Sequence, residues 1–190
     1  AFLPREEILH YEEMARLVHI CTKLGIRKVR ITGGEPLLKK DISVFVHMLR
    51  GIPELQEISM TTNGVHLEKS ASDLKRAGLQ RINISLDTLN QDKYHKITGN
   101  NYFDSVWNGI QKAIACALLP VKINVIPMRG INDDEILAFA KLSVDYPLVV
   151  RFIELFPTNT RSKMIMDSFI PNTKIKKILT DYFGALILKN

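Results

Sequence analysis

Cysteine is scarce in this chain of 190 residues, which contains two, Cys21 and Cys116. They are far apart in the sequence, and each lies in an apolar stretch of helical character, which is typical of a free thiol inside a protein. A disulfide is not expected, because the sequence has no secretory features. Two cysteines also cannot hold a cluster that needs three or four thiolate ligands. The chain by itself therefore offers no thiolate-bound metal site.

Long hydrophobic runs and an N-terminal leader are lacking as well. No stretch approaches the ~20 apolar residues that span a bilayer, and no charged segment followed by an apolar run opens the chain. We therefore expect a cytoplasmic protein without a membrane segment. Aromatic residues make up 7% of the chain and do not alternate with its short basic clusters, so nucleic-acid binding is not predicted.

The residues that are present are those of a globular domain. Apolar residues make up 46% and charged residues 24% of the chain, and its length suffices for one sizeable core. The net charge of +6 is modest and suits an anionic ligand. The chain begins with Ala1 rather than Met and ends on the apolar run Ala185–Leu188. Both ends look cut, so we expect a fragment of a longer protein.

Strand-like and helical patterns alternate along the chain. Five strands are predicted to start near residues 27, 57, 80, 121 and 148. Such alternation predicts an α/β fold with a parallel sheet or barrel. A capping box is predicted at Asn132–Glu135, with Asn132 as the cap and Glu135 reaching back. The predicted helices are Glu12–Leu24, Ile42–Leu49, Leu67–Ala77, Phe103–Leu118, Asp133–Asp145 and Thr173–Phe183.

The predicted strands alternate polar and apolar residues, although parallel strands covered on both faces are usually apolar throughout. Because successive side chains point to opposite faces of a strand, the apolar set can face the helices while the polar set shares the other face. In a curved sheet that polar face would line a cavity for a large, anionic ligand. The polar set comprises Lys28, Arg30, Thr32, Ser59, Thr61, Asn83, Ser85, Asp87, Lys122 and Asn124.

The sharpest motif is Thr32-Gly33-Gly34-Glu35-Pro36-Leu37, directly after the first predicted strand. Two glycines let a ligand approach the backbone closely. Glu35 places a carboxylate at the carboxyl end of the strand, where α/β folds bind ligands. The alternative is a tight turn between strand and helix with no further role.

Together with its neighbours, this motif resembles the glycine motif of radical-SAM enzymes of the molybdenum cofactor biosynthesis protein A family. The resemblance covers nearly the whole chain and rests on several matches in order. They are Phe2–Pro4, Glu12–Arg16, Lys28–Leu37, Thr61–Gly64, Arg81–Asp87, Val121–Asn124, Gly130–Asp133 and Arg151–Glu154.

The resemblance implies an incomplete TIM-like (βα) barrel of the radical-SAM type, without its first strand and its C-terminal extension. Residues 1–156 would be the partial barrel core, and residues 157–190 the start of the C-terminal region. It implies a lyase, a GTP 3',8-cyclase of molybdopterin synthesis that uses S-adenosylmethionine and 4Fe-4S clusters. It also implies a homodimer and a later protein of the same pathway as partners.

Matched residue by residue, the resemblance assigns two groups of ligand-binding positions. Gly34 and Ser85 would bind S-adenosylmethionine, with Glu35 beside them and Phe156 where the family usually has Met. Arg30, Thr61 and Lys122 would bind GTP, and Lys28 and Arg151 would assist with its triphosphate.

The cysteines depart from the family pattern, and this leaves alternatives open. The family's first cluster loop would lie before Phe2 and its second set of cysteines beyond Asn190, so the chain alone is expected to be inactive. One alternative is a relic without clusters that binds a nucleotide or a partner chain. Another is a phosphate-binding barrel of aldolase type with Lys122 as its Schiff-base lysine.

Overall fold

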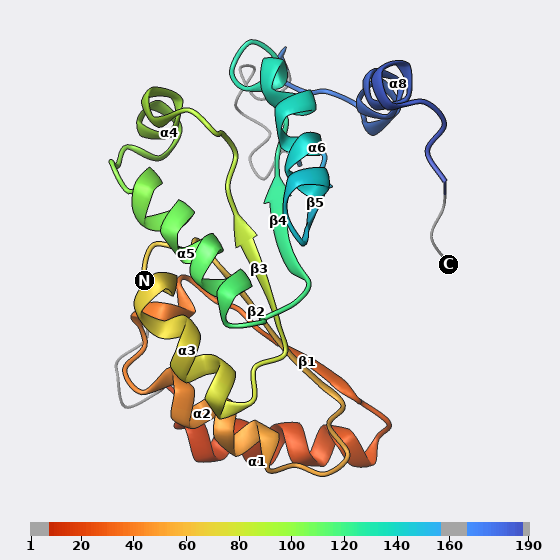
Figure 1. The fold of residues 1–190 in the computed structure, drawn as a ribbon. Helices are drawn as coiled ribbons and strands as arrows, with labels where there is room; N and C mark the ends of the chain where they lie inside the picture. The colour runs from red at the N-terminus through yellow and green to blue at the C-terminus, as the bar shows by residue number, and fades with distance from the viewer. Residues whose placement is uncertain (1–7, 157–166, 188–190) are drawn as a thin grey trace.

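A sheet of five parallel strands organises the computed structural model, which describes residues 8–156 and 167–187. Every neighbouring pair of strands is parallel, and their order in the sheet is their order in the sequence. The predicted α/β fold with five parallel strands is confirmed (Figure 1). The strands are β1 (Lys28–Ile31), β2 (Glu57–Thr62), β3 (Arg81–Ser85), β4 (Val121–Val125) and β5 (Leu148–Phe152).

Helices follow the strands as the sequence predicts, with one addition. The predicted helices are found as α1 (Tyr11–Lys23), α2 (Ile42–Arg50), α3 (Leu67–Ala77), α5 (Phe103–Ala115), α6 (Ile136–Asp145) and α8 (Asn172–Phe183), with short 3-10 helices η2 (Pro36–Leu38) and η3 (Asp133–Glu135). The unpredicted helix is α4 (Gln91–Thr98), in which Tyr94 is the buried residue. Its cap was the signal that could have found it, because the side chain of Asn90 accepts from the Lys93 amide.

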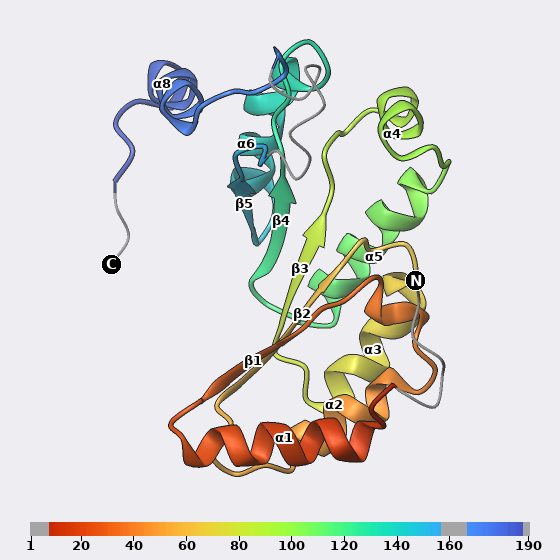
Figure 2. The same ribbon diagram turned by 180° about the vertical axis from the view of Figure 1, so that it is seen from behind.

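The helices gather on one face of the sheet, as Figures 1 and 2 show for α2, α3 and α5. The strand side chains that point toward them are fully buried, with exposed fractions of 2% or less for Ile58, Met60, Ile82, Ile84, Leu86, Val121, Ile123 and Val125. The predicted division of the strands into an apolar and a polar face is therefore confirmed for β2, β3 and β4. On the polar face, no described helix lies over these strands.

Close helix packing behind the sheet depends on a glycine. A Cβ atom added at Gly109 of α5 would lie 2.8 Å from the carbonyl oxygen of Gly64 and 3.0 Å from the Cβ atom of Leu67 on α3. Gly109 is buried. The absence of a Cβ atom at Gly109 therefore lets α5 lie close to the start of α3.

Both edges of the sheet lack a further strand within the described ranges. β1 pairs with β2 alone and β5 with β4 alone, so each of them is an edge strand in the described part of the chain. Near the β5 edge of the sheet, α8 packs on α6 through a small cluster of Ile136, Ile170 and Ile175. The division of the chain at residue 156 stays a prediction, and residues 157–166 lie outside the described ranges.

The capping box predicted at Asn132–Glu135 is wrong. Asn132 makes no side-chain hydrogen bond that caps the helix. Its side-chain amide instead bonds to backbone groups of the segments that follow β3 and β4. The Glu135 carboxylate accepts from the Thr88 hydroxyl at 2.8 Å and the Leu89 amide at 2.6 Å. Both side chains form hydrogen bonds with the segments that follow the strands instead of capping a helix. No helix in the described part of the chain is long and apolar enough to cross a membrane.

Candidate functional site

Register between the strands arranges the polar side chains in rows across the open face. Arg30 pairs with Ser59, and Ser59 pairs with Arg81. The next row toward the carboxyl ends contains Thr61, Asn83 and Lys122. The row after that contains Ser85, Asn124 and Arg151. Residues from five strands are thereby brought to one surface. Their order in rows across that surface depends on the register between strands, which the alternation alone does not give.

Positive charge gathers on this surface around Lys122. The pKa of Lys122 is lowered, first by burial and then by the nearby positive charges of Arg151, Arg81 and Arg30, while Glu57 raises it. Removing a lysine from water and surrounding it with arginines both disfavour its charged form. An anion bound at this face would relieve that repulsion.

A tight turn at the carboxyl end of β1 leaves its backbone accessible. A Cβ atom added at Gly33 or Gly34 would meet nothing within 4 Å, and Gly33 has a φ of +152°. The turn lines a hollow of about 720 Å³, which Tyr11 and Met14 of α1 also border. The space in front of the two glycines can therefore admit a ligand.

Glu35 fixes this turn to the end of β2. One carboxylate oxygen accepts from the Leu37 amide at 3.0 Å and from the Thr62 hydroxyl at 2.6 Å. The other accepts from the Asn63 amide at 2.7 Å. A carboxylate that accepts several hydrogen bonds is held firmly. These hydrogen bonds support a role for Glu35 in positioning the glycine turn.

Asp87 and Asn124 lie near the carboxyl ends of β3 and β4. Asp87 Oδ1 accepts from the Ile126 amide at 2.8 Å, and burial raises the pKa of Asp87 although that hydrogen bond lowers it. Asn124 Oδ1 is buried without a hydrogen-bond partner among the described residues. Buried polar atoms are rarely left unpaired, so this oxygen is free to accept a hydrogen bond from a ligand donor.

Most of the predicted site residues come together on this face. Thr61 and Lys122 share one row, while Lys28 and Arg30 extend from β1 and Arg151 from β5. Gly34 and Ser85 lie at or beyond the carboxyl ends of their strands. Phe156 lies beyond the end of β5 with 80% of its surface exposed. Its side chain is therefore not packed against the other predicted site residues.

Sequence reasoning missed Arg81 and Glu57. They form an ion pair, with Arg81 Nη1 3.1 Å from Glu57 Oε2. Both are first residues of their strands. Extending the observed alternation by one step, from Asn83 to Arg81 and from Ser59 to Glu57, would have placed them on the polar face.

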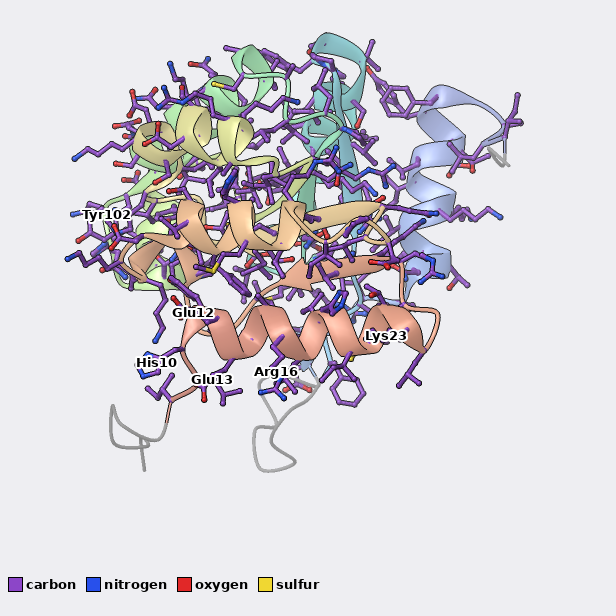
Figure 3. The ribbon with its side chains drawn as sticks, turned by 90° about the horizontal axis from the view of Figure 1, so that it is seen from below. His10, Glu12, Glu13, Arg16, Lys23 and Tyr102 are labelled. Carbon is purple, nitrogen blue, oxygen red and sulfur yellow. The ribbon has the colours of Figure 1, made fainter. Side chains whose placement is uncertain are left out.

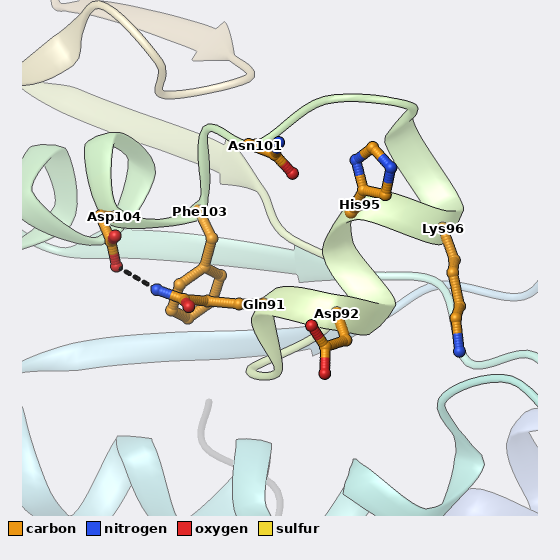
Figure 4. Close-up of a pocket in the computed structure, with 7 residues that line it drawn as sticks. All are labelled: Gln91, Asp92, His95, Lys96, Asn101, Phe103 and Asp104. Carbon is orange, nitrogen blue, oxygen red and sulfur yellow. Dashed lines mark hydrogen bonds between the residues drawn. The ribbon is translucent and has the colours of Figure 1, made fainter.

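Two other surfaces stand apart from these rows. A hollow of about 440 Å³ lies beside α4 and the start of α5, where Gln91 donates to Asp104 at 2.7 Å (Figure 4). The outer side of α1 carries charged side chains such as Arg16 and Lys23, and Glu13 accepts from the His10 amide at its start (Figure 3). None of the predicted ligand-binding residues belongs to either surface.

An iron–sulfur cluster does not fit the thiols of this chain. Cys21 is exposed on α1, whereas Cys116 ends α5 with its sulfur 3.3 Å from the Ser72 hydroxyl. Within the described ranges, no three His, Cys, Asp or Glu side chains are grouped so that they could hold a metal ion.

Comparison with known proteins places this geometry in a family. Residues 2–143 match the radical SAM superfamily. A GTP 3',8-cyclase of Petrotoga mobilis is 47% identical over 185 residues, which are 97% of this chain and 57% of that protein. One of Moorella thermoacetica is 49% identical over 171 residues, covering 90% and 53%. The chain thus spans little more than half the length of these relatives.

Solved structures agree on the fold. A radical SAM methyltransferase from Sphaerobacter thermophilus matches with a TM-score of 0.66 and 17% identity, over 91% of this chain and 55% of that one. Coproporphyrinogen III oxidase from Escherichia coli matches with a TM-score of 0.58 and 15% identity, over 92% and 45%. The family match also argues against the aldolase-type alternative. This chain belongs to the radical SAM superfamily and is a homologue of the GTP 3',8-cyclases.

Proposed function

We propose that this chain forms the nucleotide-binding sheet of a GTP 3',8-cyclase, an enzyme that rearranges GTP on the way to the molybdenum cofactor. The observation that carries the proposal is the cationic surface around Lys122, combined with an open glycine turn at the end of β1. The similarity to proteins named GTP 3',8-cyclase supports it. By the same similarity, we propose a homodimer that passes its product to a later protein of molybdopterin synthesis.

The triphosphate of GTP would lie against the cations of the polar face. Arg30 and Arg151 can each bind phosphate oxygens through two parallel hydrogen bonds, whereas Lys28 and Lys122 act as point charges. Thr61 shares a row with Lys122 through Asn83 and has a hydroxyl that can donate to a phosphate or ribose oxygen. Binding of the anion would return the pKa of Lys122 toward its ordinary value.

S-adenosylmethionine would lie at the carboxyl ends of the strands. The backbone of Gly34 is open to it, and Ser85 can offer its hydroxyl from the exposed end of β3. Glu35 would act through the turn that it fixes, and Phe156 would contact the adenine through its backbone. When bound, S-adenosylmethionine supplies the radical chemistry, and the chain supplies position and charge.

A second candidate function, nucleotide binding without turnover, is favoured by one observation. The two thiols lie on separate helices, and a radical-SAM reaction requires a cluster held by three or four thiolates. The two candidates share the GTP site and differ in whether this chain can support cleavage of S-adenosylmethionine.

Titration with GTP tests the site that both candidates share. Lys122→Gln should weaken GTP binding by about tenfold, because a hydrogen bond to a charged group is lost. Arg76→Gln is the matched control, since Arg76 lies on α3 with 80% of its side chain exposed. Equal affinity in the unchanged chain and both variants, measured by calorimetry, would contradict the proposed site.

A further inference from the structure

Arg81 faces the same surface as the cations that the family resemblance assigns. In the register of the sheet it shares a row with Arg30, and Ser59 lies between them. With strands spaced by about 4.8 Å, the two Cα atoms are roughly 10 Å apart. The chain of phosphates in a polyphosphate can span two guanidinium groups at this separation.

The residue between the two arginines is a small, buried serine. Ser59 is 4% exposed, and its hydroxyl lies 3.2 Å from the carbonyl oxygen of Val29, to which it donates. The side chain is small, and its hydroxyl hydrogen is already used by the Val29 carbonyl oxygen. Ser59 therefore offers no free hydrogen-bond donor between Arg30 and Arg81, and the two guanidinium groups are the cationic donors of this row.

Glu57 neutralises the charge of Arg81. It lies opposite Lys28, one row before the row that contains Arg30 and Arg81. The two side chains form an ion pair at 3.1 Å, with 42% of the Arg81 side chain and 19% of the Glu57 side chain exposed. Glu57 pairs in register with Lys28 on β1, so the carboxylate lies at the amino end of the face. Because 42% of the Arg81 side chain is exposed, solvent screens the pair on that side, and a polyphosphate can compete with the carboxylate for the guanidinium.

The charge of Arg81 already reaches the centre of the proposed site. It is one of three arginines whose charges lower the pKa of Lys122, after the effect of burial. Glu57 acts on the same lysine in the opposite direction. The pair is thus electrostatically part of the surface around Lys122, although both residues begin their strands.

We propose that Arg81 is a further phosphate-binding residue of this face, and that Glu57 is the counter-ion that holds the guanidinium in place until a polyphosphate replaces it. The ligand class is a nucleoside triphosphate or another linear polyphosphate. The inference rests on the proposed function for the location of the anion, and it adds one cation and one carboxylate that the family resemblance does not assign.

Binding of inorganic tripolyphosphate to the chain, followed by calorimetry, tests this role without requiring a cluster. Arg81→Gln should weaken binding by about tenfold, and Arg81→Lys, which keeps the charge and loses the paired hydrogen bonds, should weaken it less. Arg76→Gln removes the same charge from α3 and should leave the affinity unchanged. A thermal melt without ligand confirms that each variant is folded.

Glu57→Gln tests the counter-ion. Removing the carboxylate should tighten tripolyphosphate binding by about threefold when Arg81 is present. The gain should shrink in the Arg81→Gln background, because the effects of coupled residues are not additive. Asp73→Asn, which frees the exposed Arg76 in the same way, is its control. An equal gain from Glu57→Gln in both backgrounds would overturn the counter-ion role.

The failure of this inference can be told from the failure of the proposed function. If Arg30→Gln weakens tripolyphosphate binding and Arg81→Gln does not, Arg81 is not part of the site while the GTP site stands. If the unchanged folded chain does not bind tripolyphosphate, both proposals are overturned.

Discussion

The side-chain nitrogen of Asn132 lies 2.6 Å from the backbone oxygen of Asp87 and 3.0 Å from that of Ile126. Its side-chain oxygen accepts from the Met128 amide at 2.6 Å. One amide group, 2% exposed, therefore joins the segments that leave β3 and β4. Because Ser85 lies at the end of β3, Asn132 helps to fix the edge at which we place S-adenosylmethionine.

Asn132→Asp should lower the free energy of unfolding by about 2–4 kcal/mol. The variant keeps the shape of the side chain but loses the donor to two part-buried carbonyl oxygens, and an unpaired buried polar group costs about 1–3 kcal/mol. Urea unfolding measures the loss. Asn101→Asp, on the exposed loop before α5, should change the stability by less than about 0.5 kcal/mol. Equal effects of the two changes would contradict the linking role of Asn132.

Asp87 should make the stability depend on pH in a defined direction. Burial raises its pKa above the ordinary value of 3.8, so the folded chain holds this proton to a higher pH than the unfolded chain does. The cost of charging the buried carboxyl is absent below 3.8, grows as the pH rises, and is complete above the folded pKa.

Asp87→Asn should remove this cost, because an amide oxygen can still accept from the Ile126 amide. The variant should gain stability over the unchanged chain at neutral pH and lose that advantage as the pH falls toward 3.8. Urea unfolding at a series of pH values provides the measurement. Asp145→Asn, at the exposed end of α6, is the control. A constant difference at all pH values would show that the titration of Asp87 is not responsible.

Most of the fold and much of the candidate site could be predicted from the periodicity of the strands. Alternation of residues such as Ile82 and Asn83 predicted both the core face and the polar face, since a strand has a period of two. The alternation of strand and helix patterns along the chain predicted parallel pairing. Glycine after β1 marked the open turn, because a missing Cβ leaves the backbone accessible.

Long-range partners were not accessible from local patterns. The contact of Asn132 with Asp87 joins residues 45 positions apart, and no propensity distinguishes it from a helix cap. The pair of Arg81 and Glu57 depends on register between β2 and β3, which a single sequence does not give. α4 was missed because its amphipathic pattern is weak and it buries little.

Two glycines should separate binding from stability. Gly34→Ala meets open space and should leave the melting temperature unchanged, while the added methyl group narrows the approach to the backbone and weakens binding of S-adenosylmethionine. Gly109→Ala would place a methyl group 2.8 Å from the Gly64 carbonyl oxygen, and such overpacking costs about 1–3 kcal/mol. Thermal melts and ligand titration of both variants provide the measurement. Loss of stability in Gly34→Ala would contradict the open turn.

The open edge of β1 should make the chain prone to association. Unpaired edge strands are templates for another chain, and exposed apolar residues lie beside this one at Leu24 and Ile26, with exposed fractions of 81% and 46%. Leu24→Lys should reduce light scattering without changing the melting temperature. Val144→Lys, at a 75% exposed position on α6, is the matched control. A monodisperse monomer with a cooperative melt in the unchanged chain would contradict the prediction.

Reconstitution with iron and sulfide under anaerobic conditions should not make this chain cleave S-adenosylmethionine. A cluster of this kind takes three or four thiolates, and the chain has Cys21 and Cys116 on different helices. Iron that binds loosely should bind equally to the double variant Cys21→Ser, Cys116→Ser. The measurement is formation of 5′-deoxyadenosine from S-adenosylmethionine by both proteins. If the unchanged chain forms this product and the double variant does not, its own thiols hold a working cluster, and the second candidate function, binding without turnover, must be abandoned.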